Sequence, residues 1–387
     1  MSVCGRVQMS RRRMSGPSGL RCVPVDDLVD LAHQSVTLGV KEMCCRIGID
    51  SGSFKRAASS LERVGRLKIS DELLRQIVES EGTAAVRWQE QEQLELDFEA
   101  GKCITTCTAD QSPVCRVYVG LDGFMLPMVT QLEADKRYEK ARERRKKLPR
   151  KRGCRRRRLV KRQGADQRYK EYKLVNFYDQ EMEHRLLRVT RHGPERAGKM
   201  LRQMADDVHL FKAKQIVAVA DGAPWIGGVI SGCLPAEKTT AILDFYHASE
   251  HVHQARRVVY GESSEAGETW AGRIIQGMLE GNFDDWWQLI VETRSRVRAR
   301  SKRKAMDGLM EYLLSRKEKI AYARFRAMGL KIGSGPTESG CKSEARRLKG
   351  VGMRWTAENA QAMLALESLH QSNLWKTYWN SKLKAAA

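Results

Sequence analysis

The feature that most constrains this chain is a continuous run of apolar residues from Ile216 to Ala220, followed directly by Asp221 and Gly222. A strand with apolar side chains on both faces is buried on both faces, which is typical of α/β sheets covered by helices. In open α/β sheets, functional side chains gather at the carboxyl ends of the strands. The run therefore predicts an α/β fold with Asp221 at a functional edge of its sheet.

Two further carboxylates stand in similar settings. The segment from Val117 to Leu121 alternates along its length, which predicts a strand that ends at Asp122 and aims this side chain opposite to Leu121. Around Glu338, the motif GSGPTES has glycines that allow a sharp turn and a proline suited to the first turn of a helix. An isolated Asp-Gly pair usually marks a turn, but three carboxylates beside strand ends or a helix start predict one shared site.

The chemistry expected of such a site is metal binding. Hard divalent cations prefer oxygen ligands and take a few carboxylates together with water and phosphate. Two such ions roughly 4 Å apart can activate an attacking oxygen and stabilise the leaving one. The chain has no GxSxG, Walker or HExxH motif as a rival. We therefore expect Asp122, Asp221 and Glu338 to bind Mg²⁺ or Mn²⁺.

The charge of the chain points to a polyanionic partner. Its 387 residues include 69 Lys plus Arg against 47 Asp plus Glu, a net charge of +22. Nucleic acid is the first candidate and an anionic membrane the second, with a solvated basic surface as the alternative. A basic arm over 136–162, which includes Arg155 and Arg156, is too charged to form a core. We expect this arm, partly helical or disordered, to contact DNA.

The sequence gives no sign of a membrane-bound or secreted protein. No apolar run approaches the ~20 residues of a membrane span, and no apolar stretch follows the Arg-rich start as in a signal peptide. The ten cysteines are scattered, which is typical of reduced thiols in the cytoplasm. Cys103 and Cys107 are too isolated to indicate a zinc site.

Near the N-terminus, the pattern favours a helix-turn-helix. We expect a helix over Lys41–Ile47, a turn at Gly48 and a second helix capped by Ser51. The second helix would present Lys55 and Arg56 to a DNA groove. The alternative is an ordinary helical hairpin packed on the core.

Changes in composition and periodicity divide the chain into successive segments. We expect a disordered tail over residues 1–25, a helical DNA-binding region over 26–82 and a linker over 83–113. We expect the first part of a catalytic core over 114–250, an all-helical insertion over 251–331 and the last part of the core over 332–387. Lys342 and Arg346 lie further along the helix of Glu338, where we expect them to bind phosphate.

The order of motifs is also informative. After Asp122 come DGAPW at the end of the buried strand, LDFYH on the next strand, then GSGPTESGCK and RLKGVGMRW. From Val114 to Trp375 the chain resembles the Kra-type insertion-sequence (ISKra-like) transposases, bacterial DDE transposases with an RNase H-like core. The resemblance implies a mixed five-stranded sheet interrupted by an all-α insertion.

The resemblance also assigns roles to residues. It implies Asp122, Asp221 and Glu338 as the metal-binding triad, and Asp244 with His247 as the Asp-x-x-His pair after the second catalytic strand. It places YKEYKLVNFYD in the third-strand region. In another interpretation, His247 and His251, one helical turn apart, form a zinc site with Asp244; a single histidine that orients phosphate or a carboxylate is the alternative.

The expected function is DNA transposition, by metal-dependent strand cleavage and strand transfer. The partners would be double-stranded DNA, as terminal inverted repeats and as target, and further copies of the chain assembled on DNA. The expected location is the bacterial cytoplasm, in association with the nucleoid. Two alternatives stay open. One is a nuclease of the same fold without strand transfer. The other is a catalytically decayed DNA-binding relic, although the intact triad argues against decay.

Overall fold

The computed structural model describes residues 12–16, 21–23, 36–91, 94, 96–107, 111–147 and 159–386. Its centre is a mixed sheet in the order β6-β5-β4-β7-β8. The strands are β4 (Pro113–Pro127), β5 (Tyr169–Asp179), β6 (Arg185–Thr190), β7 (Gln215–Ala220) and β8 (Thr239–Leu243). β5 pairs antiparallel with both β4 and β6, whereas β7 pairs parallel with β4 and β8 pairs parallel with β7. This is the RNase H-like arrangement, so the predicted fold class is confirmed.

The sheet differs from the expectation in three details. A short sixth strand, β3 (Ile104–Thr106), pairs antiparallel with the start of β4 inside the expected linker. Asp122 lies within β4 rather than at its end, because β4 continues to pair with β5 as far as Pro127. The segment YKEYKLVNFYD forms the second strand of the core, and the third is β6, which we had not predicted.

The reason β6 escaped prediction is a buried charge. Arg188 lies in the middle of this short strand and is only 3% exposed. Its guanidinium forms an ion pair of 2.6 Å with Asp207, at the end of helix α6 (Pro194–Asp207). A strand that buries an arginine with a distant partner does not show the apolar pattern by which strands are recognised.

Alternate side chains of the strands point to two covered faces. Val117, Val119 and Ala218 share a core with α6 and with helix α7 (Pro224–Cys233). Tyr118 and Val217 belong to a second core, which continues into the helical insertion. Both faces of the sheet are therefore buried, and its carboxyl edge is left for chemistry.

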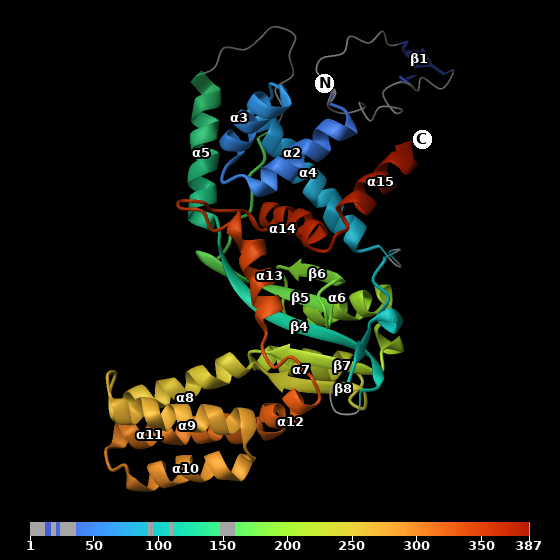
Figure 1. Cartoon of the computed structure of the whole chain (residues 1–387). Coiled ribbons are helices and arrows are strands. Elements are labelled where there is room, and N and C mark those ends of the chain that lie inside the picture. Colours follow the sequence, from blue (N-terminus) through green and yellow to red (C-terminus); the bar gives the residue numbers. More distant parts are fainter. Residues whose placement is uncertain are drawn as a thin grey trace.

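The insertion is entirely helical between β8 and α13 (Gly335–Arg346), apart from short connections. It begins at Phe245, two residues after the last residue of β8, so the expected boundary at 251 falls inside the first helix. Trp270 and Trp286 are buried within it. In Figure 1 it extends from one end of the sheet. Its helices are α8 (Phe245–Tyr260), α9 (Glu265–Glu280), α10 (Phe283–Arg296), α11 (Arg300–Leu314) and α12 (Tyr322–Ala327).

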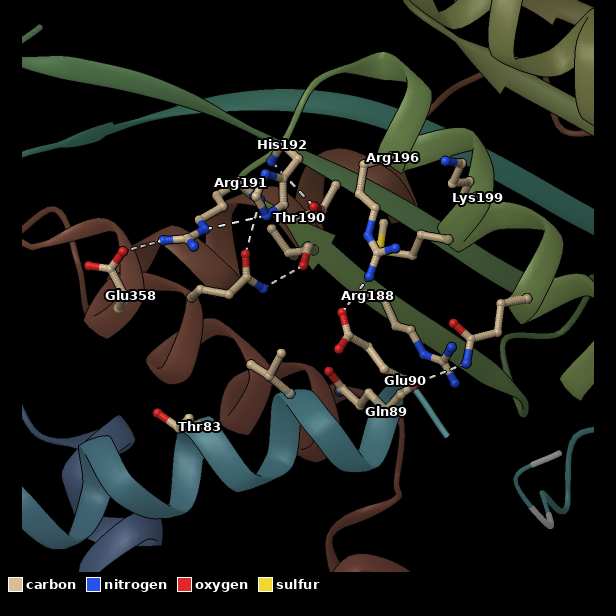
Figure 2. Close-up of a pocket in the computed structure, with 15 residues that line it drawn as sticks. Thr83, Gln89, Glu90, Arg188, Thr190, Arg191, His192, Arg196, Lys199 and Glu358 are labelled. Carbon is tan, nitrogen blue, oxygen red and sulfur yellow. Dashed lines mark hydrogen bonds and ion pairs between the residues drawn. The ribbon is translucent and has the colours of Figure 1, made fainter. Parts of the chain in front are cut away.

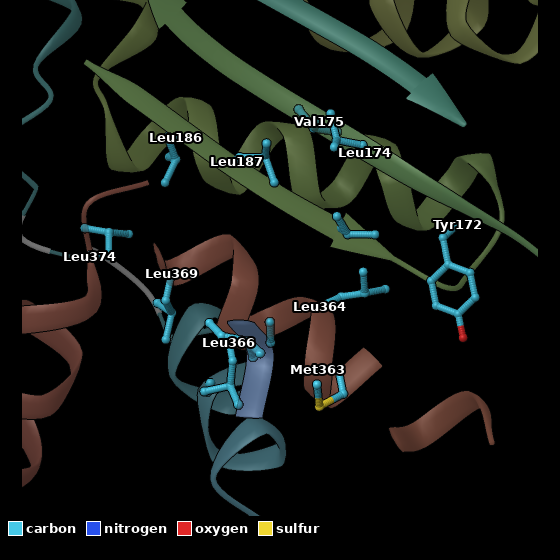
Figure 3. Close-up of a cluster of buried hydrophobic side chains, with 14 of the residues drawn as sticks. Tyr172, Leu174, Val175, Leu186, Leu187, Met363, Leu364, Leu366, Leu369 and Leu374 are labelled. Atoms are coloured by element: carbon cyan, nitrogen blue, oxygen red, sulfur yellow. The ribbon is translucent and has the colours of Figure 1, made fainter. Parts of the chain in front are cut away.

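The N-terminal helices lie at the opposite end (Figure 1). They are α2 (Leu38–Asp50), α3 (Phe54–Gly65) and α4 (Asp71–Gln89), and they share one core with the sheet and with α14 (Ala357–Gln371). Figure 3 shows how α14 contacts the sheet in this core: leucines of α14 face those of β5 and β6. This arrangement fits the alternative interpretation of the region, a helical hairpin packed on the core. The expected end of the region at residue 82 falls inside α4.

Two local expectations in this region were wrong. Gly48 is not in a turn but inside α2, where a Cβ would lie 2.8 Å from Val78 Cγ2, so the glycine permits close packing of α2 on α4. Ser53 rather than Ser51 caps α3, since its side chain accepts a hydrogen bond of 3.1 Å from the Arg56 N–H. A glycine needed for helix contact and one needed for a turn look alike in sequence.

The basic arm begins as a helix. Helix α5 covers Gln131–Lys147, and residues 148–158, which include Arg155 and Arg156, lie outside the described residues. The chain returns to the core at Ala165, which bridges to Thr130. α5 stands away from the sheet in Figure 1.

The ends of the chain contain only small elements in their described parts. In the stretch 1–25, expected to be disordered, β1 (Met14–Ser15) and β2 (Arg21–Cys22) pair antiparallel. The start of the helical region expected from residue 26 lies outside the described residues as far as residue 35. The last helix is α15 (Trp375–Ala386). Across the described helices, none combines the length and apolarity that a membrane span requires.

Candidate metal centre

The strand register brings two of the predicted carboxylates to the same edge of the sheet. In the parallel pair β4–β7, Gly120 is opposite Val219. Asp122 and Asp221 each follow two residues later, so they lie at the same level on neighbouring segments. β7 ends at Ala220, and Asp221 leaves the sheet there while β4 continues. The prediction that these two aspartates meet follows from parallel register alone.

Helix α13 brings the third carboxylate across β4. It packs closely on β4 at Gly120, where a Cβ would lie only 1.8 Å from Thr337 Oγ1, so a larger residue would displace the helix or its Thr337. One helical turn further, Cys341 lies beside Asp122, which projects from the same face of β4 as Gly120. Glu338 lies between these two contacts, in the first turn of α13.

Asp244 fixes the start of that helix. It is 1% exposed and follows β8 directly. One carboxylate oxygen accepts a hydrogen bond of 2.7 Å from the His247 N–H and caps α8, and the other accepts from the Ser334 N–H. Ser334 then bonds Glu338 twice, through its carbonyl to the Glu338 N–H (3.0 Å) and through its hydroxyl to Oε1 (3.2 Å). Both oxygens of Asp244 are thus occupied, and it positions Glu338.

The carboxylates line a common cavity of about 330 Å³. Its walls comprise Leu121, Asp122, Asp221, Asp244, Tyr246, His247, Glu250, Ser334 and Glu338. Burial raises the pKa of Asp122 above its usual range, and the neighbouring charges of Asp221 and Glu338 raise it further. Three segments far apart in sequence therefore place negative charge at one point.

Each carboxylate also has a local partner. Asp122 accepts from the Gly123 N–H (2.6 Å), Asp221 accepts from the Ala223 N–H (2.9 Å), and Glu338 lies 3.6 Å from Lys342 Nζ. In the described part of the chain, one group of three potential ligand residues has its ligand atoms within 4.8 Å of one another, and these three carboxylates are not that group. Their oxygens therefore do not all lie within 4.8 Å of one another. Side-chain rotations would be needed for all three to bind one ion.

The histidines do not form the alternative zinc site. His247 is exposed at the cavity, whereas His251 stacks on Tyr312 with ring centroids 3.7 Å apart. The two imidazole centroids are 5.2 Å apart and the rings are nearly perpendicular. Asp244 is committed to backbone N–H groups, and it does not join the two histidines in a ligand group within the described ranges.

The sequence did not reveal one cation beside the site. Arg316, from the connection after α11, donates a hydrogen bond of 3.3 Å to the Gly222 carbonyl, next to Asp221. Its guanidinium lies 4.2 Å from the ring centroid of Tyr312. The insertion therefore contributes a positive charge to the carboxyl edge of the sheet. No local motif marks this arginine among the many in the chain, because the contact depends on how the insertion folds back.

The predicted DNA-binding residues are distributed over the surface. Lys342 and Arg346 are exposed on α13, and Arg346 lies 3.6 Å from Asp50 of α2. Lys55 and Arg56 are exposed on α3. Their contact with DNA remains a prediction.

A second pocket, of about 300 Å³, lies away from the carboxylates between α4, β6, α6 and α14 (Figure 2). Several of its charged side chains pair with one another. Arg191 contacts Glu358 (2.7 Å) and Arg196 contacts Glu90 (2.6 Å), and none of the predicted site residues lines it. We therefore place the candidate metal centre in the carboxylate cavity.

Comparison with known proteins gives limited similarity. No protein-family model matches the chain. A protein of Streptococcus gallolyticus, described as the UPF0236 protein in vanSb 3'region, is 34% identical over 74 residues. That match covers 19% of this chain and only 16% of the relative. A chain of the Drosophila P element transposase strand transfer complex superposes with a TM-score of 0.36 at 9% identity, over 88% of this chain and 93% of that one.

Proposed function

We propose that this chain is a DDE transposase, which binds the ends of a mobile DNA element and catalyses metal-dependent strand cleavage and strand transfer. The observation that carries the proposal is the convergence of Asp122, Asp221 and Glu338 on one cavity at the carboxyl edge of an RNase H-like sheet. The resemblance of the motifs to the Kra-type transposases supports it. The net charge of +22 suits a DNA substrate.

The donor atoms fit a hard divalent cation. They are carboxylate oxygens. The pKa of Asp122 is raised first by burial and then by the charges of Asp221 and Glu338, and a nearby cation would offset these charges. Asp122, Asp221 and Glu338 would hold Mg²⁺ or Mn²⁺. When bound, such ions activate the attacking oxygen and stabilise the leaving oxygen of an in-line displacement at phosphorus.

The remaining residues would orient the substrate and the ligands. Asp244 holds the start of α13 through Ser334 and so positions Glu338. Lys342 and Arg346 would bind backbone phosphates along the exposed side of the same helix. The first attack would use water to free a 3′-hydroxyl at the element end, and this hydroxyl would then attack target DNA. We expect several copies of the chain to assemble on the DNA, in the bacterial cytoplasm.

The test uses duplexes that carry the DNA flanking this gene, with Mg²⁺ and a target plasmid. Asp122→Asn, Asp221→Asn and Glu338→Gln keep side-chain shape but remove charge that the ion needs. Each should abolish cleavage while duplex binding persists. Glu250→Gln is the matched control, because Glu250 lines the same cavity but pairs with Arg257 at 2.7 Å.

The products separate the candidate functions. Joining of cut ends to the plasmid supports a transposase, whereas cleavage without joining supports the nuclease. DNA binding without any metal-dependent cleavage by the wild type would leave only the decayed relic. A triad variant that cuts at the wild-type rate would remove that residue from the site.

A further inference from the structure

A second group of ligand-type side chains lies at the other end of β4 from Asp122. Asp179 ends β5 and His184 precedes β6, so both belong to one hairpin. Cys103 follows the short helix η1 (Ala100–Lys102) and precedes β3. One ligand atom from each of the three residues lies within 4.8 Å of the others. The cluster therefore joins the β5–β6 hairpin to the segment that leads into β3.

One oxygen of this cluster is buried without a partner. Asp179 is 7% exposed, and its Oδ2 lies 2.9 Å from His184 Nδ1. Its Oδ1 has no hydrogen-bond partner among the described residues, although it is buried. A buried carboxylate oxygen without a donor is costly, and such atoms are rare unless an ion or water serves them. The unpartnered oxygen is thus free to contact an ion or a water molecule.

We propose that Cys103, Asp179 and His184 bind a Zn²⁺ ion. Thiolate, carboxylate and imidazole are the usual protein ligands of zinc. One thiolate and one carboxylate also neutralise the charge of the ion, with His184 bound as neutral imidazole. The thiol proton of Cys103 leaves to solvent as the sulfur–zinc bond forms. Three protein ligands leave a fourth position for water.

A reactive thiol is a poorer interpretation of the same cluster. Burial raises the pKa of Cys103 to about 12, and the charge of Asp179 adds to this effect. A nucleophilic cysteine needs the opposite shift. A second thiol lies nearby, since Cys115 donates a hydrogen bond of 2.6 Å to the carbonyl of Ala100 in η1. This sulfur does not belong to the group whose ligand atoms lie within 4.8 Å of one another, so the three-residue set stands.

The ion would hold three segments together. Asp179 pairs with Val117 in β4, so the cluster lies five positions before Asp122 on that strand and outside the carboxylate cavity. Zinc would fix the hairpin of β5 and β6 and the start of β3 against the first half of β4. This role is independent of the proposed transposase activity.

The test is metal binding by the full chain. After treatment with a chelator, the protein is titrated with ZnCl₂ and, separately, with CoCl₂, whose thiolate complexes give a charge-transfer absorption band. We expect one tightly bound equivalent, a thiolate–cobalt band and a melting temperature that rises with zinc concentration. Cys103→Ser should remove the band and weaken zinc binding by at least about 100-fold, more than the loss of a ligand's hydrogen-bond partner costs.

Two further ligand variants and two controls complete the experiment. Asp179→Asn and His184→Gln should weaken binding but keep the thiolate band at high cobalt, and Cys233→Ser, in α7, should change neither. Asp122→Asn should leave the band intact, which separates this site from the carboxylates. A wild-type protein without a thiolate–cobalt band, or a Cys103→Ser protein that keeps it, would overturn the proposal and leave a hydrogen-bonded cluster only.

Discussion

The contact between Gly120 and Thr337 allows a sharp test of how Glu338 is positioned. In Gly120→Ala, the new Cβ would lie 1.8 Å from Thr337 Oγ1, whereas ordinary contact begins at 3.4 Å. Helix α13 or its Thr337 must therefore retreat by about 1.6 Å, since packed cores leave little free space. We expect overpacking to cost about 1–3 kcal/mol of stability. A displacement of about 1 Å at a catalytic group can cost about 100-fold in rate.

The assay measures Mg²⁺-dependent cleavage and thermal unfolding side by side. Gly120→Ala should reduce cleavage about 100-fold while the protein remains folded. Adding Thr337→Ala should restore part of the activity, because the nearest remaining atom, the Cβ of residue 337, lies at 2.9 Å. Gly272→Ala is the control, since a Cβ on this α9 residue meets nothing within 4 Å. Wild-type cleavage by Gly120→Ala, or a double variant no better than the single, would refute this account.

Three further predictions concern charge. The pKa of Asp122 is raised in the folded protein, so its protonated carboxyl contributes to stability. This contribution is fully present at a pH below the ordinary pKa of 3.8 and is lost as the pH rises through the folded pKa. Asp122→Asn in chelator should thus melt higher than wild type at neutral pH but not in acid, and a lower melting temperature at neutral pH would contradict this. Replacing Lys140, Lys146 and Lys147, exposed on α5, with Ala should reduce the slope of log K against log salt by about 0.9 for each lost phosphate contact; an unchanged slope would exclude α5 from DNA contact. Replacing Lys55 and Arg56 with Ala should lower the preference for element ends over random duplex, whereas equal loss on both would indicate phosphate contact only.

The candidate site could be predicted from sequence where its geometry follows from local rules. Parallel strands share a carboxyl edge, so the positions of Asp122 and Asp221 followed from two strand patterns. The glycine and proline before Glu338 correctly indicated a helix start. The position of that helix over β4 could not be read in this way. A glycine within a strand can mark a close approach, but the sequence does not say that α13 is the element that approaches Gly120.

The cluster around Cys103 shows the opposite case. Along the sequence this cysteine is isolated, and the structure brings it to Asp179 and His184 by two separate pairings. β3 pairs with the start of β4, and β5 returns along β4 so that Asp179 reaches Val117. Neither pairing follows from the spacing of the three residues. Contacts between distant segments, including that of Arg316 with Gly222, depend on tertiary structure that local patterns do not contain.

Helix α13 also connects the metal centre to the N-terminal helices. At its start, Asp244 holds Ser334; at its end, Arg347 donates to the Gly48 carbonyl of α2 (3.1 Å). The Arg347 guanidinium lies 4.8 Å from the ring centroid of Phe54, the first residue of α3. Burial lowers the pKa of Arg347 to about 10. The helix that carries Glu338 is therefore anchored by β8 at one end and by α2 and α3 at the other. The helix predicted to contact DNA and the helix of the predicted metal ligand are thus in direct contact through Arg347.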